Sequence, residues 1–273
     1  MTATKEKADH IIRRNNVTVK GQSEKVLVFA HGFGCDQYVW DKIAPAFETK
    51  YRVVLFDYVG SGRSDKKAYD NNRYRTLHGY KEDLLELCDA LDLENIVFIG
   101  HSVSSMIGAL AAAERPELMK NLIMIGPSPH YLNEEEYTGG FERAQIDGML
   151  QMIKGDYSEF ARFLSPVVMQ NASRPHLAED FERLLCQNEP DIIADFAEAT
   201  FLSDFREDLA KVEVPTLILQ TRNDAVASEA VGKYVHSQLP NSEFKLMDAE
   251  GHSPHVSDAP ETISLITEYL AAH

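Results

Sequence analysis

A serine in a tight, glycine-containing turn is the strongest chemical signal in the sequence. Ser102 lies in the segment Gly100-His101-Ser102-Val103-Ser104, directly after the apolar run Ile96–Gly100 and before a helical pattern. A sharp strand-to-helix turn holds a serine hydroxyl above the edge of a sheet, and the helix N-terminus places backbone N–H groups beside it. The segment departs from the usual G-x-S-x-G pattern, because Ser104 stands where the last glycine is common. We predict that Ser102 is a nucleophile.

A serine nucleophile needs a base and a group that orients the base, because its hydroxyl is weakly reactive at neutral pH. Asp224 follows the apolar run Thr216–Gln220 after a short loop, and His252 lies in a loop before the last helical pattern. Neighbouring Asn223 carries no negative charge and cannot replace Asp224. The chain order serine, aspartate, histidine fits three side chains that meet at one edge of a sheet. Ser102, His252 and Asp224 are therefore the predicted catalytic residues.

A glycine-containing turn after the first apolar run is the predicted oxyanion hole. The segment His31-Gly32-Phe33-Gly34 follows Val26–Ala30. Backbone N–H groups aimed at the oxygen of a tetrahedral intermediate lower the barrier to acyl transfer by about 3 kcal/mol each. We predict that the N–H groups of Phe33 and Val103 serve this purpose, with the Phe33 ring forming an apolar wall of the substrate pocket.

Two other segments match a cofactor-binding or metal-binding motif only in part. The segment from Asp57 to Ser64 contains Gly60 and Gly62 after a strand pattern, but it lacks the third glycine of a dinucleotide-binding loop and no helix pattern follows. His252 and His255 are separated by Pro254, which prevents a helical pair of metal ligands. We therefore predict no cofactor and no metal.

The elements that position these residues alternate between strand and helix patterns. Five short, nearly continuous apolar runs indicate strands that are covered on both faces, which is typical of a parallel sheet. They are residues 26–30, 53–57, 96–100, 122–125 and 216–220. Helical patterns occur at residues 40–47, 77–91, 106–115, 229–239 and 261–272. The alternation predicts an α/β fold with functional residues at the carboxyl ends of the strands.

Between residues 131 and 208 no strand pattern occurs. Helical stretches around residues 141–153, 157–169, 177–185 and 191–201 alternate with glycine and proline breaks. We assign residues 131–206 to a helical cap over the active site, and residues 1–130 and 207–273 to the core. The alternative is that these helices belong to the outer layer of the core.

Composition excludes several partners. The 273 residues include 27 Lys and Arg against 43 Asp and Glu, a net charge of −16, which repels nucleic acid and anionic lipid. Cys35, Cys88 and Cys186 are widely spaced and fit reduced thiols. Residues 1–16 are polar, and no apolar run approaches the roughly 18 residues of a membrane span. We expect a cytoplasmic protein that binds neither nucleic acid nor membranes.

Several blocks resemble one group of α/β hydrolases, namely the bacterial stress-response regulator RsbQ and the plant karrikin and strigolactone receptors. The blocks are Phe29–Gln37, Leu55–Gly62, Gly100–Val103, Tyr137–Glu142 and Glu250–His255. RsbQ-type proteins usually carry glycine at the position of Ser104, so that the turn around Ser102 looks more like that of the plant receptors.

The resemblance implies an α/β-hydrolase fold with a mostly parallel sheet, a four-helix cap inserted over the active site, and an enclosed hydrophobic cavity. It places Ser102, His252 and Asp224 on the catalytic triad and Phe33 and Val103 on the oxyanion donors. It also places Phe160 and Phe201 on the cavity wall. The RsbQ part of the resemblance further implies a PAS-domain phosphatase as a partner.

The function that we predict is hydrolysis of a small hydrophobic ester or lactone by a serine esterase without a cofactor, in a general stress-response pathway of the RsbQ type. Two alternatives remain open. One is a ligand receptor in which binding or slow hydrolysis drives recognition of a partner protein. The other is a cofactor-free haloperoxidase or C–C hydrolase, which would use the same residues.

Overall fold

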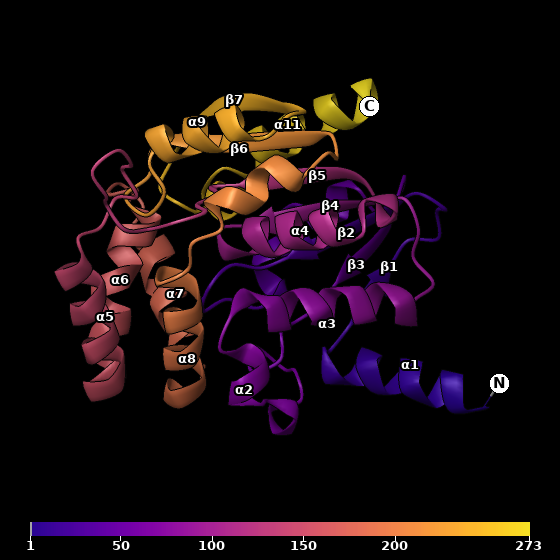
Figure 1. Ribbon diagram of the computed structural model, residues 1–273, viewed down its shortest axis with the longest axis horizontal. Coiled ribbons are helices and arrows are strands. Elements are labelled where there is room, and N and C mark those ends of the chain that lie inside the picture. Colours follow the sequence, from indigo (N-terminus) through magenta and orange to yellow (C-terminus); the bar gives the residue numbers. More distant parts are fainter. Residues whose placement is uncertain (1) are drawn as a thin grey trace.

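A mostly parallel sheet lies at the centre of the molecule (Figure 1). The computed structural model describes residues 2–273, and among them seven strands pair in the order β1-β3-β2-β4-β5-β6-β7. Every neighbouring pair is parallel except β1 with β3. The strands are Thr18–Lys20 (β1), Val26–Ala30 (β2), Arg52–Leu55 (β3), Ile96–His101 (β4), Met119–Ile125 (β5), Thr216–Asn223 (β6) and Ser242–Glu250 (β7). The predicted α/β architecture is confirmed.

Helices cover both faces of the sheet, which explains why the central strands are apolar throughout. In β2, Leu27 and Phe29 pack into one apolar cluster, while Val28 and Ala30 pack into another on the opposite face. The second cluster is covered by α3 (Leu77–Ala90), α4 (Val103–Glu114) and α9 (Glu229–Gln238), and the first by α11 (Ala259–Ala272). The sheet is thus a rigid platform whose carboxyl edge carries the loops of interest.

The predicted helix at residues 40–47 is wrong. The chain forms two short 3-10 helices there, Gln37–Trp40 and Ala44–Ala46. Pro45 lacks an N–H and its ring clashes with the preceding turn, so a continuous α-helix cannot pass through this segment.

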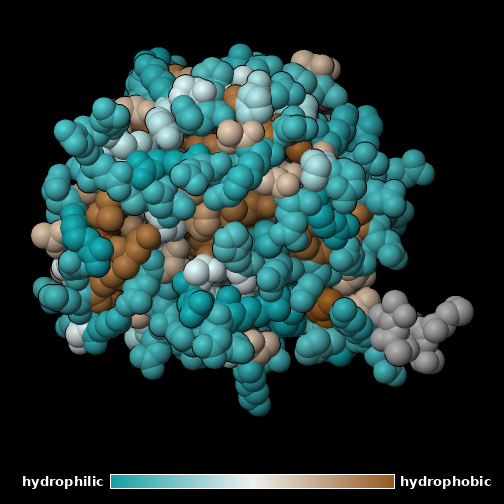
Figure 2. All heavy atoms as spheres, viewed as in Figure 1, coloured by the Kyte–Doolittle hydropathy of each residue, from teal (hydrophilic) through white to brown (hydrophobic). Residues whose placement is uncertain are grey.

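Four helices lie together at one end of the sheet, at the left of Figure 1. They are α5 (Arg143–Gly155), α6 (Tyr157–Met169), α7 (His176–Leu185) and α8 (Pro190–Phe201). All four fall between β5 and β6 in the chain; α5 packs against α6 and α8, and α6 against α7. The Asp156 side chain begins α6 by accepting a hydrogen bond from the Glu159 N–H at 3.0 Å. Figure 2 shows brown, hydrophobic side chains gathered over these helices, on a face that is otherwise mainly teal.

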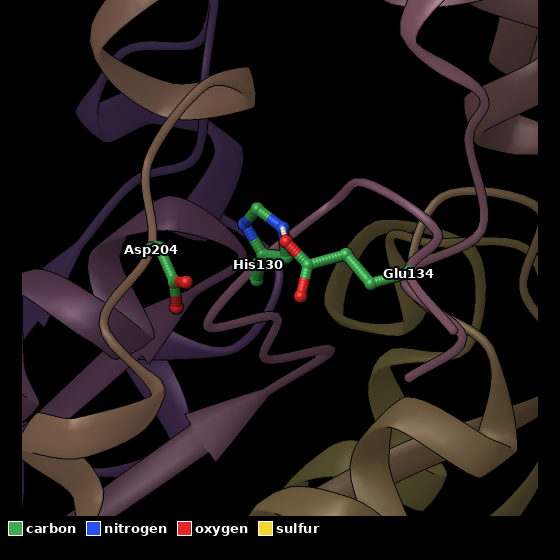
Figure 3. Close-up of side chains that lie close together, drawn as sticks. All are labelled: His130, Glu134 and Asp204. Carbon is green, nitrogen blue, oxygen red and sulfur yellow. Dashed lines mark ion pairs between the residues drawn. The ribbon is translucent and has the colours of Figure 1, made fainter. Parts of the chain in front are cut away.

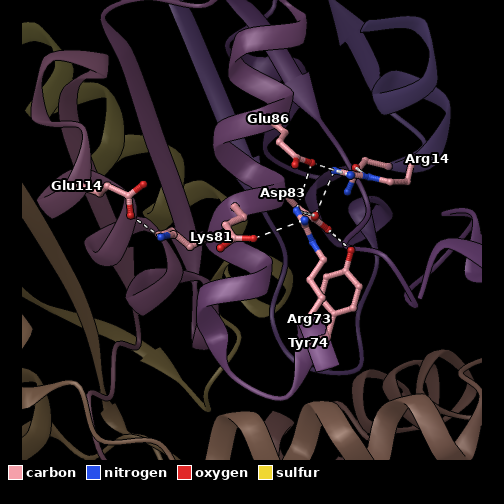
Figure 4. A network of polar contacts seen from close by, with 9 residues as sticks. Arg14, Arg73, Tyr74, Lys81, Asp83, Glu86 and Glu114 are labelled. Atoms are coloured by element: carbon pink, nitrogen blue, oxygen red, sulfur yellow. Dashed lines mark hydrogen bonds and ion pairs between the residues drawn. The ribbon is translucent and has the colours of Figure 1, made fainter. Parts of the chain in front are cut away.

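A buried ion cluster attaches the N-terminal helix α1 (Thr2–Arg14) and the short α2 (Asn71–Tyr74) to α3 (Figure 4). The carboxylate of Asp83 is inaccessible to solvent and lies 2.7 Å from Arg73, 2.9 Å from the Tyr74 hydroxyl and 3.1 Å from Arg14. Because Arg14 belongs to α1 while Arg73 and Tyr74 belong to α2, the cluster fixes both helices against α3. Helix α1 was not expected from the polar sequence of residues 1–16.

A further short α-helix, α10 (Pro254–Ser257), precedes α11.

Candidate active site

Ser102 occupies a strained turn between β4 and α4. Its φ and ψ are 56° and −122°, a conformation that residues other than glycine rarely adopt. A Cβ atom on Gly100 would lie 2.5 Å from the carbonyl oxygen of Ser104, so only glycine fits where the chain doubles back. The turn therefore needs glycine at position 100 and projects the side chain of residue 102 from the end of the strand.

The three residues predicted to act together lie in one hydrogen-bonded chain. His252 Nε2 is 2.7 Å from Ser102 Oγ, and His252 Nδ1 is 2.7 Å from Asp224 Oδ2. Asp224 follows β6 and His252 follows β7, so both reach the carboxyl edge that also carries Ser102. Ser102 and His252 are 5% and 3% exposed. With the Nδ1 proton directed at the carboxylate, Nε2 is free to accept the serine proton.

The second carboxylate oxygen fixes the orientation of Asp224. Asp224 Oδ1 accepts hydrogen bonds from the N–H groups of Val226 at 2.8 Å and Ala227 at 2.9 Å. These bonds keep Oδ2 directed at the imidazole. The acid is thus held by its own loop, independently of the histidine.

The loop that carries His252 is fixed from two sides. The His252 N–H donates to the carbonyl of Val168 in α6 at 2.7 Å, and His101 Nε2 donates to the His252 carbonyl at 2.8 Å. At Gly251, with φ of +81°, a Cβ would lie 2.4 Å from the Met169 carbonyl. The end of α6 therefore holds the base in place.

The two predicted oxyanion donors are the N–H groups of Phe33, in the loop after β2, and of Val103, at the start of α4. Val103 is the first residue of α4, so its N–H has no acceptor within the helix. Within residues 2–273, the Phe33 N–H donates to no backbone group. Ser104, the departure from the usual motif, donates its hydroxyl to the carbonyl of His31 and accepts from the Tyr58 hydroxyl at 2.9 Å. Its extra hydroxyl is therefore satisfied and ties the Phe33 turn to α4.

A cavity of about 300 Å³ opens onto Ser102 and His252. Its walls are mainly apolar and come from the core and from all four helices α5–α8, with Phe181 contributed by α7. Lining residues include Phe33, Tyr131, Phe141, Met149, Phe163, Val167 and Phe201. Phe201, which the family resemblance places on the cavity wall, is among these lining residues. The prediction that Phe160 lies on the cavity wall is wrong. Phe160 is fully buried beside Tyr157, and Phe163, on the next turn of α6, lines the cavity instead.

Comparison with known proteins identifies the family. The family model described as alpha/beta hydrolase fold matches residues 25–259. This chain belongs to the α/β-hydrolase fold family. It is 39% identical to strigolactone esterase D14 of Arabidopsis thaliana, over 91% of this chain and 93% of the relative. It is 35% identical to karrikin insensitive 2 receptor IA of Petunia hybrida, over 93% and 94% of the two chains.

Solved structures agree with this assignment. A hydrolase from Oleispira antarctica superposes on this α/β hydrolase with a TM-score of 0.95 and 37% identity, covering 97% of this chain and 98% of the other. A bromoperoxidase from Bacillus anthracis gives a TM-score of 0.86 at 22% identity and shows the fold alone. The prediction of an ester-hydrolysing α/β hydrolase is confirmed, and so is the resemblance to the plant receptors. The assignment to the RsbQ type stays a prediction. No helix in the described part of this hydrolase is both long and apolar enough to span a bilayer.

Two further histidines of this hydrolase are buried behind the base. The His101 ring lies 5.0 Å from that of His252 and 4.4 Å from that of His255, which in turn lies 4.4 Å from Trp40. Within the described residues, neither nitrogen of His255 has a hydrogen-bond partner. Burial lowers the pKa of His255 to about 3 and that of His101 well below its usual range, with neighbouring histidines adding to both shifts. Both imidazole rings are therefore neutral in the pH range in which a histidine base such as His252 would be active.

These two neutral histidines predict loss of stability in acid. In the unfolded chain each has a pKa near 6.5, so the unfolded state binds more protons once the pH falls below about 6.5. Their contribution to stability is therefore constant above that pH, and below it each of the two histidines lowers the free energy of unfolding by about 1.4 kcal/mol per pH unit. The variant His255→Phe keeps an aromatic ring against Trp40. Between pH 7.5 and 5.0 it should lose about 2 kcal/mol less of its free energy of unfolding than the wild type loses. Urea unfolding at both pH values measures the difference.

The exposed His10 supplies the control for this prediction. His10→Ala should leave the pH dependence of the urea midpoint as it is in the wild type. If His255→Phe loses as much stability as the wild type between the two pH values, burial of the neutral ring is not the cause.

A second charged cluster lies where the chain enters and leaves the four helices (Figure 3). The side chains of His130, Glu134 and Asp204 are close enough to be candidate cation ligands. The guanidinium of Arg206, however, already lies 2.9 Å from Glu134 and 2.5 Å from Asp204, and His130 Nδ1 donates to the Ser203 carbonyl at 2.7 Å. Both carboxylates therefore already pair with the same guanidinium, and the cluster ties the two connecting segments together.

Proposed function

We propose that this chain is a serine hydrolase that cleaves small hydrophobic esters or lactones. The observation that carries the proposal is the chain of two 2.7 Å contacts from Ser102 through His252 to Asp224 beneath a mainly apolar cavity. The roles assigned to Ser102, His252, Asp224, Phe33 and Val103 belong to the proposal.

In the first half of the reaction, His252 takes the proton of Ser102 as its oxygen attacks the ester carbonyl carbon. The N–H groups of Phe33 and Val103 donate to the resulting oxyanion. His252 then gives the proton to the leaving alcohol as the carbon–oxygen bond breaks. Water, deprotonated by the same imidazole, releases the acid and regenerates Ser102. Asp224 stays ionised and stabilises the imidazolium.

The cavity supports the substrate class. At about 300 Å³ it lies at the small end of ligand pockets, and it provides few polar groups apart from those at the catalytic end. We assign residues 131–206 to a cap that closes this cavity above a core of residues 1–130 and 207–273. Because the cap excludes water, it strengthens the electrostatic stabilisation of the oxyanion.

A second candidate function is that of a receptor in which the reaction or ligand binding is the signal. The relatives named as a strigolactone esterase and a karrikin receptor favour it. So does the hydrogen bond from His252 to Val168, since movement of the catalytic loop would be passed to α6. If the resemblance to RsbQ holds, the receptor function would belong to a cytoplasmic stress pathway with a PAS-domain phosphatase as partner. The free cysteines fit the cytoplasm.

Covalent labelling tests the hydrolase proposal. We expect a fluorophosphonate probe to add once to the native wild type, with the mass increase on the peptide that contains Ser102. Ser102→Ala and urea-unfolded wild type should not be labelled. Labelling of another residue, or equal labelling of Ser102→Ala, would contradict the proposal. For the receptor function, a bound ligand should slow hydrogen exchange in α5–α8; unchanged exchange argues against it.

A further inference from the structure

The hydroxyl of Tyr131 is a buried donor that the proposed mechanism does not use. Tyr131 follows β5, is 1% exposed and lines the same cavity as Ser102 and His252. Among the described residues, its hydroxyl has no hydrogen-bond partner. A buried, unpaired hydroxyl is unfavourable by itself, so an unpaired donor in a ligand cavity points to an acceptor on the ligand.

The phenol is held in one place by its surroundings. Its ring packs edge-to-face on Phe201 with 5.1 Å between the centroids. The Tyr131 carbonyl accepts from the Phe141 N–H at 3.0 Å, and a Cβ on Gly139 would lie 2.6 Å from that carbonyl oxygen. Ring and backbone are thus fixed before a substrate enters, as a catalytic donor requires.

Burial also keeps the hydroxyl protonated. It raises the pKa of Tyr131 to about 12, although the nearby Ser102 hydroxyl opposes the shift. The group is therefore a neutral hydrogen-bond donor throughout the pH range in which an imidazole acts as a base.

The order of the strands places Phe33 and Tyr131 on opposite sides of the strand that carries Ser102, which indicates which ester oxygen each would face. Phe33 follows β2 and Tyr131 follows β5, and these strands flank β4, which carries Ser102. The end of β5 lies against the base, since a Cβ on Gly126 would be 3.0 Å from His252 Cε1. With the Phe33 N–H as oxyanion donor, as in the proposed mechanism, the carbonyl oxygen of an ester bound at Ser102 would face the β2 side. The alkoxy oxygen would face the side of His252 and Tyr131.

We propose that Tyr131 donates a hydrogen bond to the leaving-group oxygen of the substrate. As the bond between the acyl carbon and this oxygen breaks, the proton that Ser102 gave to His252 passes to the departing alcohol. Tyr131 keeps its own proton and stabilises the charge that builds up on that oxygen. This donor matters most for basic leaving groups, such as the alkoxides released from alkyl esters and lactones. The inference rests on the proposed hydrolase function and names the substrates that it favours.

The test is Tyr131→Phe, assayed with p-nitrophenyl, phenyl and trifluoroethyl acetate, plus a simple alkyl lactone. The leaving groups of this series differ in basicity, and kcat/KM reports the acylation step in which they depart. We expect a loss of about threefold or less for p-nitrophenyl acetate and of about 10- to 100-fold for the lactone. The slope of log kcat/KM against leaving-group basicity should be steeper in the variant.

Tyr137→Phe is the matched control. Its hydroxyl is also buried but donates to the His130 carbonyl at 2.9 Å, and its side chain does not line the cavity. It should lose stability without changing the slope, whereas Tyr131→Phe should be at least as stable as the wild type because it removes an unpaired donor. An equal loss on all four substrates, or no loss on the lactone, overturns the role of Tyr131. Wild-type activity no greater than that of Ser102→Ala would instead overturn the hydrolase proposal.

Discussion

Ser102→Ala is expected to lower kcat for p-nitrophenyl acetate by about 10⁵-fold or more. The substitution removes the oxygen that His252 Nε2 contacts at 2.7 Å, so no acyl-enzyme can form at residue 102. What remains is the stabilisation of a water attack by the backbone donors near residues 33 and 103, which gives only a weak rate increase over the uncatalysed reaction. Steady-state hydrolysis monitored through p-nitrophenolate measures the loss.

Ser165→Ala is the control for this variant. Ser165 is also buried, but its hydroxyl donates to the Ala161 carbonyl within α6 at 2.7 Å and does not line the cavity. Its activity should stay within about threefold of the wild type. If Ser102→Ala, with an unchanged circular dichroism spectrum, retained more than about one hundredth of wild-type activity, another group would be the nucleophile.

Residue type and strand context were enough to place the catalytic candidates. Ser102 and Asp224 each follow an apolar strand that is covered on both faces, and such strands show up in the sequence as short, nearly continuous apolar runs. His252 was found through its loop, although the strand before it was not predicted. β7 lies at the edge of the sheet and alternates exposed with less exposed side chains, so it has no continuous apolar run.

Details that depend on side-chain packing were not accessible from the sequence. Phe160 and Phe163 both fit an amphipathic α6, and only the contacts of that helix with its neighbours decide which one faces the cavity. In the same way, Tyr131 is one of several aromatic residues in the predicted cap. That its hydroxyl lacks a partner depends on residues distant in the chain. The attachment of α1 likewise depends on Asp83 in α3, since α1 itself has a weak apolar face.

Asp224→Asn is expected to lower kcat by about 10⁴-fold without unfolding the protein. The change is nearly isosteric, and the retained amide oxygen can still accept from the N–H groups of Val226 and Ala227 at 2.8 and 2.9 Å. The NH₂ group then faces His252 Nδ1, where the carboxylate oxygen lay at 2.7 Å. Because an NH₂ group only donates, Nδ1 must become an acceptor and the imidazole proton must move to Nε2. The nitrogen facing Ser102 then carries a proton and cannot take the one that the serine must lose.

Asn223→Ala separates this effect from a general disturbance of the loop. The Asn223 side chain is exposed beside Asp224, while its carbonyl, which the substitution keeps, accepts from the Gly251 N–H at 3.0 Å. This variant should retain activity within about threefold of the wild type, and both variants should unfold at similar urea concentrations. KM should change little in Asp224→Asn, because the carboxylate does not line the cavity and acts only through the base. If Asp224→Asn kept activity within tenfold of the wild type, the carboxylate would not set the proton position on His252. The limit of tenfold follows from the size of the tautomer effect.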